Sequence, residues 1–499
     1  MENKSRRPNI ILLNVDQWRA DGLGFAGHPV IETPHLDRMF MSGVNFTQAY
    51  ASVPSCIAAR ASMFTGLSQR SHGRVGYRDA VPWNYKHTIP SLLAGAGYHT
   101  QAVGKMHVYP ARNLIGFHNV VLHDGYLHQE RKNARDLSLS DDYLPWLRER
   151  KGQSADYLDT GIGCNGYVVR PWIYEDMLHP TAWVTTQSID FLRRWDTSKP
   201  FFLFASYHRP HPPLDPPESY LRMYEGKPLP ELPMGNWCGS YTNPFHAIDS
   251  PLPQDPAQRD RARRAYYAQM TFIDHQINRI THALWTYGCL ENTCIIFCSD
   301  HGDMLYDHGL LYKGKPYDSS ARIPLLIRFP DEWGMKKKTM IDAPVELRDI
   351  LPTICDIAGV EIPSRLEGSS ILPFCRGEKP SWREYIHGEH EFSMMSNQWI
   401  TDGRRKYIWY SQTGAEQFFD IEKDPCELND LCISSQPDLR LWRERLIKEL
   451  DGREEGYVKD GKLVVGRQPL NTLKESGLDI AAANWQAEVF SNSEGSVFK

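Results

Sequence analysis

The chain has 499 residues, of which 41% are hydrophobic and 23% are charged. This composition is typical of globular proteins, the length is enough for two or three domain-sized units, and the sequence contains no evident repeat or low-complexity tract. The formal net charge is -5 and the basic residues are dispersed apart from the run 336–338, so we expect no nucleic acid partner.

The ten cysteines are scattered and form no Cys-x-x-Cys pair. A zinc site or a disulfide framework is therefore poorly supported, and reduced thiols are the simpler interpretation. Near the N-terminus, the apolar run 10–13 is too short for the core of a signal peptide and is followed at once by Asn14 and Asp16. We therefore expect a cytoplasmic protein without a membrane partner.

The first predicted element is a strand over residues 9–15, which ends at Asp16 and Gln17. Its apolar run is typical of a central strand in a parallel sheet that helices cover on both faces. In open α/β sheets, ligands bind beyond the carboxyl ends of the strands, which makes Asp16 a ligand candidate. Taken alone, an Asp after a strand is more often a turn or capping residue.

A short helix near 35–42 is followed by a second predicted helix, in which Cys56 and Arg60 lie one turn apart and which Gly66 closes. Cys56 would therefore lie at the positive end of a helix dipole, with the Arg60 cation on the same face. Such a position suits a nucleophile that attacks an anionic ester. The alternative, from this stretch alone, is a small buried cysteine of the core.

Three further predicted strands also end in polar side chains. The strands and the residues after them are 98–103 with Lys105 and His107, 201–205 with His211, and 293–298 with Asp300 and His301. The carboxyl ends of parallel strands meet at one edge of a sheet, so we expect all these side chains to lie close together. A long amphipathic helix over 262–284 is predicted to pack on this sheet.

The sequence thus predicts an α/β fold with a large, mostly parallel central sheet sandwiched by helices. A smaller C-terminal α+β subdomain, with a short antiparallel sheet and a helix, is expected to follow. The predicted domains are therefore a catalytic domain over 1–378 and a C-terminal subdomain with a tail over 379–499. The stretch 110–176 is interpreted as an insertion of loops and short elements that forms a lid or a binding wall. The tail from 451 is expected to wrap over the first domain or to reach a neighbouring subunit in a homo-oligomer.

Oxygen ligands from Asp16, Gln17 and Asp300 suit a divalent cation such as calcium, magnesium or manganese, and the nitrogen of His301 favours manganese slightly. Cations around such an ion would complement a tetrahedral oxyanion, and two histidines would exchange protons with the nucleophile and the leaving oxygen. These predicted residues are the cations Arg60, Lys105 and Lys313 and the histidines His107 and His211.

With these residues in view, the sequence resembles the formylglycine-dependent sulfatases of the alkaline phosphatase superfamily. It is most similar to the branch that contains phosphonate monoester hydrolases and choline sulfatases. The resemblance rests on six segments in the family's order and a later one, namely 8–17, 56–66, 104–107, 209–212, 299–302 and 313–324, then 418–425. Any single segment would be a weak signal, whereas six in order are specific.

The resemblance implies that Cys56 is oxidised after translation to formylglycine, whose hydrate provides the attacking oxygen. It also implies one divalent cation, with calcium favoured and manganese or magnesium as alternatives. The implied metal ligands are Asp16, Gln17, the modified Cys56, Asp300 and His301. In the same scheme, Arg60 and Lys105 steady the hydrate and the metal-side oxygens, His107 takes a proton from the hydrate, and His211 and Lys313 contact the sulfate and its leaving oxygen.

The chain departs from the family's Cys-x-Pro-x-Arg signature, because Ala58 stands at the third position. This is similar to substrates of the radical maturation enzymes of anaerobes, which we therefore expect as a partner. The predicted reaction is hydrolysis of a small aryl or carbohydrate sulfate ester. Two alternatives stay open: a phosphonate or phosphate ester hydrolase with the same site, favoured by Asp16-Gln17 and 209–212, and a non-catalytic anion-binding homologue that never receives formylglycine.

Overall fold

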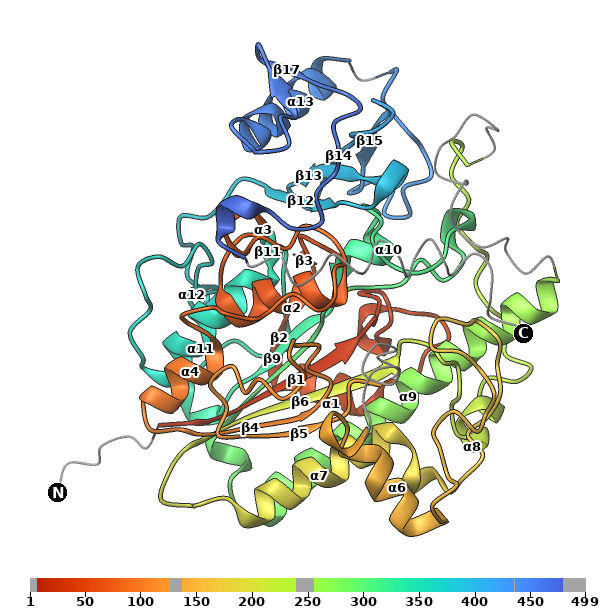
Figure 1. Cartoon of the computed structure of the whole chain (residues 1–499), viewed down its shortest axis with the longest axis vertical. Helices are drawn as coiled ribbons and strands as arrows, with labels where there is room; N and C mark the ends of the chain where they lie inside the picture. The colour runs from red at the N-terminus through yellow and green to blue at the C-terminus, as the bar shows by residue number, and fades with distance from the viewer. Residues whose placement is uncertain (1–6, 126–136, 239–254, 435, 479–499) are drawn as a thin grey trace.

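The computed structural model describes residues 7–125, 137–238, 255–434 and 436–478. They form a large α/β unit and a smaller unit that lies above it in the view of Figure 1. Within these ranges, no helix is both long enough and apolar enough to cross a membrane. The architecture is the predicted one, with a large sheet among helices and a small C-terminal antiparallel sheet.

An eight-stranded sheet forms the centre of the large unit, in the order β10-β2-β9-β7-β1-β6-β4-β5. All neighbours are parallel except at β9, which is antiparallel to both β7 and β2. The strands are β1 (Asn9–Asp16), β2 (Gly43–Phe46), β4 (His99–Gly104), β5 (Asn119–Leu122), β6 (Phe201–Pro210), β7 (Thr293–Ser299), β9 (Leu325–Arg328) and β10 (Thr339–Ile341). The prediction of a mostly parallel sheet is confirmed.

Side chains alternate between two hydrophobic cores along β1, because successive residues of a strand point to opposite faces. Ile11 and Leu13 belong to one core, and Ile10 and Leu12 belong to the other. Helices of the first core are α1 (Pro34–Met41), α6 (Tyr143–Lys151), α7 (Pro180–Arg194), α8 (Glu218–Arg222) and α9 (Pro256–Thr286). Helices of the second are α2 (Cys56–Thr65), α4 (Ile89–Gly95), α11 (Ile350–Ala358) and α12 (Leu372–Arg376).

The smaller unit is a four-stranded antiparallel sheet in the order β12-β13-β14-β15. Its elements are β12 (Ile386–His390), β13 (Asn397–Thr401), β14 (Arg405–Tyr410), β15 (Glu416–Asp420) and the helix α13 (Gln436–Leu450), followed by β16 (Val458–Lys459) and β17 (Lys462–Leu463). The domain boundary predicted after residue 378 falls between α12 and β12. Short elements between the units are β3 (Ala49–Tyr50), α3 (Gln69–His72), α10 (Asp318–Ala321), β8 (Arg322–Ile323) and β11 (Val345–Glu346).

The insertion predicted over 110–176 contains an edge strand of the central sheet, β5, and the helix α6. Residues 322–327 are a largely apolar run of strand length, but they do not form one strand. The run is broken at Pro324, and its halves β8 and β9 join different sheets. Proline has no N–H to donate to a ladder, which gives the physical reason for a break at this residue.

The end of the described tail, from residue 471 on, lies over the first domain beside α3, whereas β16 and β17 lie with the smaller unit (Figure 1). The backbone N–H of Val75 donates to the carbonyl of Asn471 over 3.1 Å, and the N–H of Leu473 donates to the carbonyl of Gly73 over 2.8 Å. The side-chain amide of Asn471 also donates to the carbonyl of Tyr77 over 3.0 Å. This is one of the two arrangements predicted for the tail, while residues 479–499 lie outside the described part of the chain.

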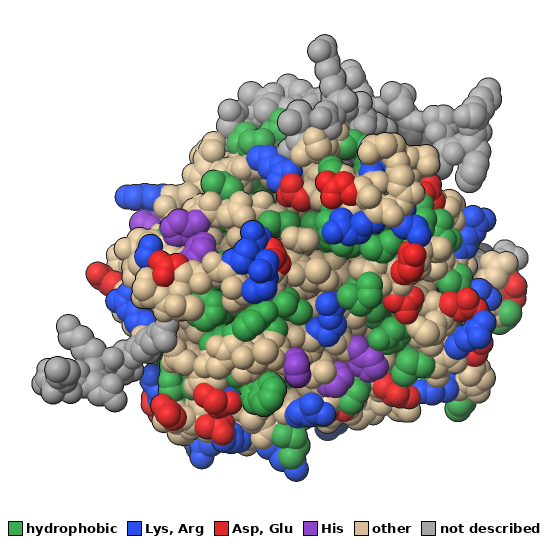
Figure 2. All heavy atoms as spheres, turned by 90° about the horizontal axis from the view of Figure 1, so that it is seen from below, with side chains coloured by type: hydrophobic (Ala, Val, Ile, Leu, Met, Phe, Trp, Pro, Cys, Tyr) green, Lys and Arg blue, Asp and Glu red, His purple; other side chains and the backbone are tan. Residues whose placement is uncertain are grey.

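Basic and acidic side chains are interspersed over the face of the molecule shown in Figure 2. Ion pairs also form within single helices, between Arg194 and Asp190 on α7 and between Arg222 and Glu218 on α8. Mixed charges of this kind give no strong field of one sign over this face.

Candidate active site

Four neighbouring parallel strands, β7, β1, β6 and β4, bring the predicted site residues to one edge of the central sheet. Asp16 ends β1, Asp300 and His301 follow β7, His211 follows β6, and Lys105 follows β4. The backbone N–H of His211 donates to the carbonyl of Asp16 over 3.2 Å, which ties two of these strand ends together. The expected convergence therefore occurs.

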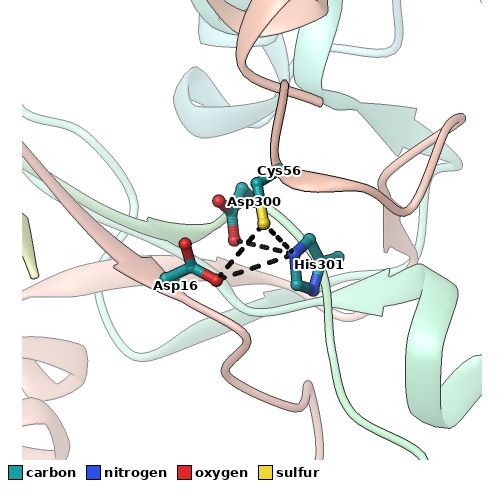
Figure 3. Close-up of side chains that lie close together, drawn as sticks. All are labelled: Asp16, Cys56, Asp300 and His301. Atoms are coloured by element: carbon teal, nitrogen blue, oxygen red, sulfur yellow. Dashed lines mark hydrogen bonds and ion pairs between the residues drawn. The ribbon is translucent and has the colours of Figure 1, made fainter. Parts of the chain in front are cut away.

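Asp16, Cys56, Asp300 and His301 form a buried cluster in which one ligand atom of each lies within 4.8 Å of the others. Figure 3 shows the four side chains pointing toward one another. The Cys56 Sγ lies 3.1 Å from Nε2 of His301 and 3.7 Å from Oδ1 of Asp16. Two carboxylates and an imidazole are a donor set that suits a divalent cation, so these residues fit the predicted metal.

The ring of His301 is oriented by its own backbone neighbour. Its Nδ1 lies 2.9 Å from the carbonyl of Gly302, so Nδ1 carries the proton and donates it. This leaves the lone pair of Nε2 directed at the cluster, as is typical of histidines that bind metal ions.

Gln17 lies beside the cluster in a left-handed backbone conformation, with φ of 69°. Its backbone N–H donates to Oδ1 of Asp300 over 3.2 Å, and its side-chain amide donates to Oδ2 of Asp303 over 2.6 Å. The side-chain oxygen of Gln17 accepts from Nζ of Lys313 over 2.9 Å. Gln17 as a metal ligand stays a prediction, while the observed contacts orient its oxygen toward Lys313.

Cys56 is the first residue of α2, after Ser55 in extended conformation, and Gly66 ends the helix in the left-handed conformation. The helix begins and ends as predicted. Burial and the carboxylate of Asp16 act to raise the pKa of the Cys56 thiol, but neighbouring cations, led by Lys105, outweigh them and lower it. The site therefore stabilises negative charge at this position.

Arg60 joins α2 to β6 and to the ends of β4 and β7, and its side chain is fully buried. Its Nε donates to Oδ2 of Asp300 over 3.0 Å. Its Nη1 donates to the carbonyl of Lys105 over 2.7 Å and to Oγ of Ser206 over 3.0 Å. The planar guanidinium thus fixes the positions of several groups around the cluster at once.

Lys105 forms an ion pair with Asp16, and both side chains are buried. Burial opposes the charge of Lys105, but Asp16 outweighs it and raises the pKa of the ammonium. Burial likewise acts to raise the pKa of Asp16, yet Lys105 and other nearby cations hold it well below its usual value. The preceding Gly104 has φ of 95°, and a Cβ there would lie 2.0 Å from the Ser206 carbonyl, so the turn that presents Lys105 requires glycine.

His107 has φ of 55°, a strained conformation for a residue other than glycine. The backbone N–H groups of Met106 and His107 both donate to Oδ1 of Asp124, which holds this turn. Burial, and then the cations Lys105 and Arg60, keep the pKa of His107 well below its usual value. Among the described residues, neither ring nitrogen of His107 has a hydrogen-bond partner, so a neutral imidazole is available to a substrate.

Lys313 and His211 meet on the other side of the cluster, where Nζ of Lys313 lies 2.6 Å from Nε2 of His211. Burial, and then the charge of Lys313, keep the pKa of His211 well below its usual value. All the predicted catalytic side chains are thus grouped around Cys56.

Sequence reasoning did not find several residues of this site. Asp124 holds the His107 turn, Ser206 binds Arg60, and Asp303 receives hydrogen bonds from Gln17 and from Tyr167 in the insertion. Asp303 follows the His301 segment closely and was detectable by its position, whereas Asp124 lies in a loop without a motif. Residues 126–136, which belong to the insertion predicted as a lid or binding wall, lie outside the described chain.

Residues 8–360 match the sulfatase family model. The chain belongs to the sulfatase family. A model described as the C-terminal part of N-sulphoglucosamine sulphohydrolase matches residues 306–455. An arylsulfatase of Clostridium perfringens is 51% identical over 478 residues, which cover 94% of this chain and 99% of the relative.

More distant relatives agree with this assignment. A choline-sulfatase of Rhizobium meliloti is 30% identical, over 85% of this chain and 82% of its own. The crystal structure of a phosphonate monoester hydrolase of Agrobacterium radiobacter superposes with a TM-score of 0.76 at 26% identity, over 89% of this chain and 95% of that one. This sulfatase is therefore a sulfuric ester hydrolase with the fold of the alkaline phosphatase superfamily, as the sequence motifs predicted.

Proposed function

We propose that this sulfatase hydrolyses aryl sulfate monoesters, using a formylglycine made from Cys56 and one divalent cation. The observation that carries the proposal is the position of Cys56 at the start of α2, inside the cluster of Asp16, Asp300 and His301. The aryl group is favoured because the 51% identical relative is named an arylsulfatase. Carbohydrate sulfates are the alternative, since an ulvan-active sulfatase of Formosa agariphila is 27% identical.

In the proposal, Asp16, Asp300 and His301 hold the cation together with the group made from Cys56, and the side-chain oxygen of Gln17 is a further ligand. Calcium is the first choice, with manganese and magnesium as alternatives. A bound cation would polarise a sulfate oxygen and offset the charge of the two buried carboxylates.

The chain's own cations provide the rest of the charge stabilisation. Arg60, Lys105 and Lys313 are held in fixed positions by Asp300, Asp16 and Gln17 respectively. Fixed cations in a buried site need no reorganisation as charge grows on the oxygens of a sulfate ester in the transition state. They therefore bind the transition state more tightly than the substrate.

The two histidines are given separate proton-transfer roles. His107, with both ring nitrogens unpartnered among the described residues, takes a proton from the nucleophilic group at position 56. His211 and Lys313, joined through Nε2 and Nζ, contact the leaving oxygen and supply its proton.

Maturation requires a partner enzyme that oxidises Cys56. Ala58 is buried within α2, so in the folded chain the segment around Cys56 is not accessible. We infer that a radical maturation enzyme, which accepts alanine two residues after the cysteine, acts on the chain before it folds.

The test is turnover of 4-nitrophenyl sulfate by protein co-expressed with such an enzyme, together with the mass of the peptide that contains Cys56. A loss of 18 Da from that peptide is expected, because a thiol becomes an aldehyde. The Cys56→Ala variant is expected to be inactive, while Cys355→Ala, at another buried cysteine, keeps its turnover. Normal turnover in Cys56→Ala would refute the proposal.

A second candidate, hydrolysis of phosphonate or phosphate monoesters, is favoured by the superposition on a phosphonate monoester hydrolase. Comparing kcat/KM for 4-nitrophenyl sulfate and 4-nitrophenyl phenylphosphonate separates the two. Protein that is co-expressed with the maturation enzyme but keeps an unmodified Cys56 thiol, and that turns over neither ester, would instead support the anion-binding alternative.

A further inference from the structure

Helices α1 and α9 bring together three side chains that can bind a metal ion, outside the cluster around Cys56. His35 lies in the first turn of α1, and Asp274 and His275 are adjacent on α9. One ligand atom from each of the three lies within 4.8 Å of the other two. The same helix also reaches the active site, because the hydroxyl of Tyr266 on α9 donates to the carbonyl of Gln17. Asp274 is eight residues further along α9, so about 12 Å of helix separates the three side chains from Tyr266.

The carboxylate of Asp274 is fully buried. Its oxygens accept the backbone N–H groups of His35 over 3.1 Å and Leu36 over 2.7 Å, which fixes the carboxylate at the start of α1. Within the described chain, no Lys or Arg forms an ion pair with Asp274. Burial raises its pKa to about 7, as expected for a carboxylate whose charge is not offset by a cation.

The imidazoles of His35 and His275 are partly exposed and lie edge to face, with ring centroids 5.2 Å apart and planes at 76°. Nδ1 of His35 is a buried atom without a hydrogen-bond partner among the described residues. Nδ1 of His275 lies 3.0 Å from the hydroxyl of Tyr220. If Nδ1 of His275 donates to this oxygen, its Nε2 lone pair is free, as in many metal-binding histidines.

We propose that His35, Asp274 and His275 bind a divalent first-row transition ion, with zinc as the ion to test. Two neutral imidazoles and one carboxylate are ligands that zinc prefers, and a water molecule would fill the fourth position. Zinc–ligand distances of ~2.0–2.2 Å require these atoms to approach by about 1 Å, which rotation of the two partly exposed rings permits. The ion would offset the charge of Asp274 and join α1 to α9.

The experiment uses the full chain, freed of transition metals with a chelator and kept in excess calcium to occupy the cluster around Cys56. Equilibrium dialysis against micromolar zinc and measurement of Tm are compared for three proteins: wild type, the double variant His35→Gln/His275→Gln, and His282→Gln. His282 is an exposed histidine further along α9 and serves as the matched control.

The wild type and His282→Gln are expected to bind one more zinc per chain than the double variant, and zinc is expected to raise Tm in those two proteins only. Circular dichroism and sulfatase turnover show whether the double variant is folded. If it is not, the single variant His275→Gln replaces it; because it lacks one of the three proposed ligands, it is expected to lose more than tenfold in zinc affinity. Equal zinc binding by the wild type and the double variant, or loss of the ion in His282→Gln, would overturn the proposal.

Discussion

The ammonium of Lys313 lies 2.6 Å from Nε2 of His211, and Nδ1 of the same ring lies 2.8 Å from the carbonyl of Pro212. Since the carbonyl can only accept, Nδ1 carries the ring proton and Nε2 accepts from Lys313. His211 is therefore neutral, and one proton is held between Nζ and Nε2. In the proposed reaction, this shared proton would be the one supplied to the leaving oxygen, so the role of donor belongs to the pair rather than to either residue alone.

Lys313→Ala is expected to lower kcat by about 10²–10³-fold for esters with poor leaving groups, because the donated proton and a fixed positive charge are both lost. The loss is expected to be smaller for 4-nitrophenyl sulfate, whose leaving group needs little protonation. The test is to measure kcat of the wild type and of Lys313→Ala for a series of phenyl sulfates whose leaving groups differ in pKa. Lys338→Ala, in an exposed loop, is the control, and an equal loss for all leaving groups would contradict the assigned role.

Arg60→Lys is expected to reduce kcat by about 10²-fold and to lower Tm by several degrees. Lysine keeps the charge but cannot donate simultaneously to Asp300, Lys105 and Ser206, so buried acceptors lose their partners. Arg70→Lys, at an exposed position on α3, provides the comparison. Wild-type turnover in Arg60→Lys would mean that charge alone suffices at this position.

Chelation is expected to abolish turnover and to lower Tm, because the cluster of Asp16, Asp300 and His301 would lose the cation that offsets its two buried carboxylates. Adding back calcium, manganese or magnesium separately identifies the effective ion by recovered turnover. Asp300→Asn is expected to bind the ion more weakly than the wild type in the same titration. Full turnover after exhaustive chelation, with no ion detected by mass spectrometry, would rule out the metal.

Stability is expected to fall as the pH rises from about 4.5 to about 8, because of Glu391. Burial, and then the charge of Glu389, raise the pKa of Glu391 from 4.5 to about 8 in the folded chain. Between these two pH values the folded chain keeps the Glu391 proton while the unfolded chain loses it. The free energy of unfolding therefore falls as the pH rises through this range, by a few kcal/mol at most. The free energy of unfolding, measured in urea, should vary less with pH in Glu391→Gln than in the wild type. In Glu361→Gln, at an exposed position, it should vary with pH as in the wild type.

Truncation after Pro469 is expected to lower Tm and to raise KM, because it removes the tail contacts with Gly73 and Tyr77. The ring of Tyr77 lies 6.1 Å from that of His107, so movement of this segment reaches the site. A chain ending at Leu478 keeps those contacts and is the reference. Identical KM values for the two truncations would show that the tail does not support the site.

Apolar runs of strand length predicted the neighbouring strands β1, β4, β6 and β7 of the central sheet and, with them, the position of the site. Asp16, Lys105, His211 and Asp300 were predictable because each follows such a run, and parallel strands place their carboxyl ends at one edge. The edge strand β5 was not predicted, because a strand of four residues in a long polar segment has too little periodicity to detect.

The sequence by itself determined the family, the fold class and the residues around Cys56, since these depend on local runs and motifs. Only the tertiary structure decided which groups orient them: Asp124 at the His107 turn, Asp303 beside Gln17, and the tail along Gly73. These contacts join residues from loops and from distant parts of the chain. Each of these hydrogen bonds is made by one side chain or one backbone group, so it leaves no periodic pattern in the sequence. Its partner depends on how the helices, strands and loops pack in the folded chain.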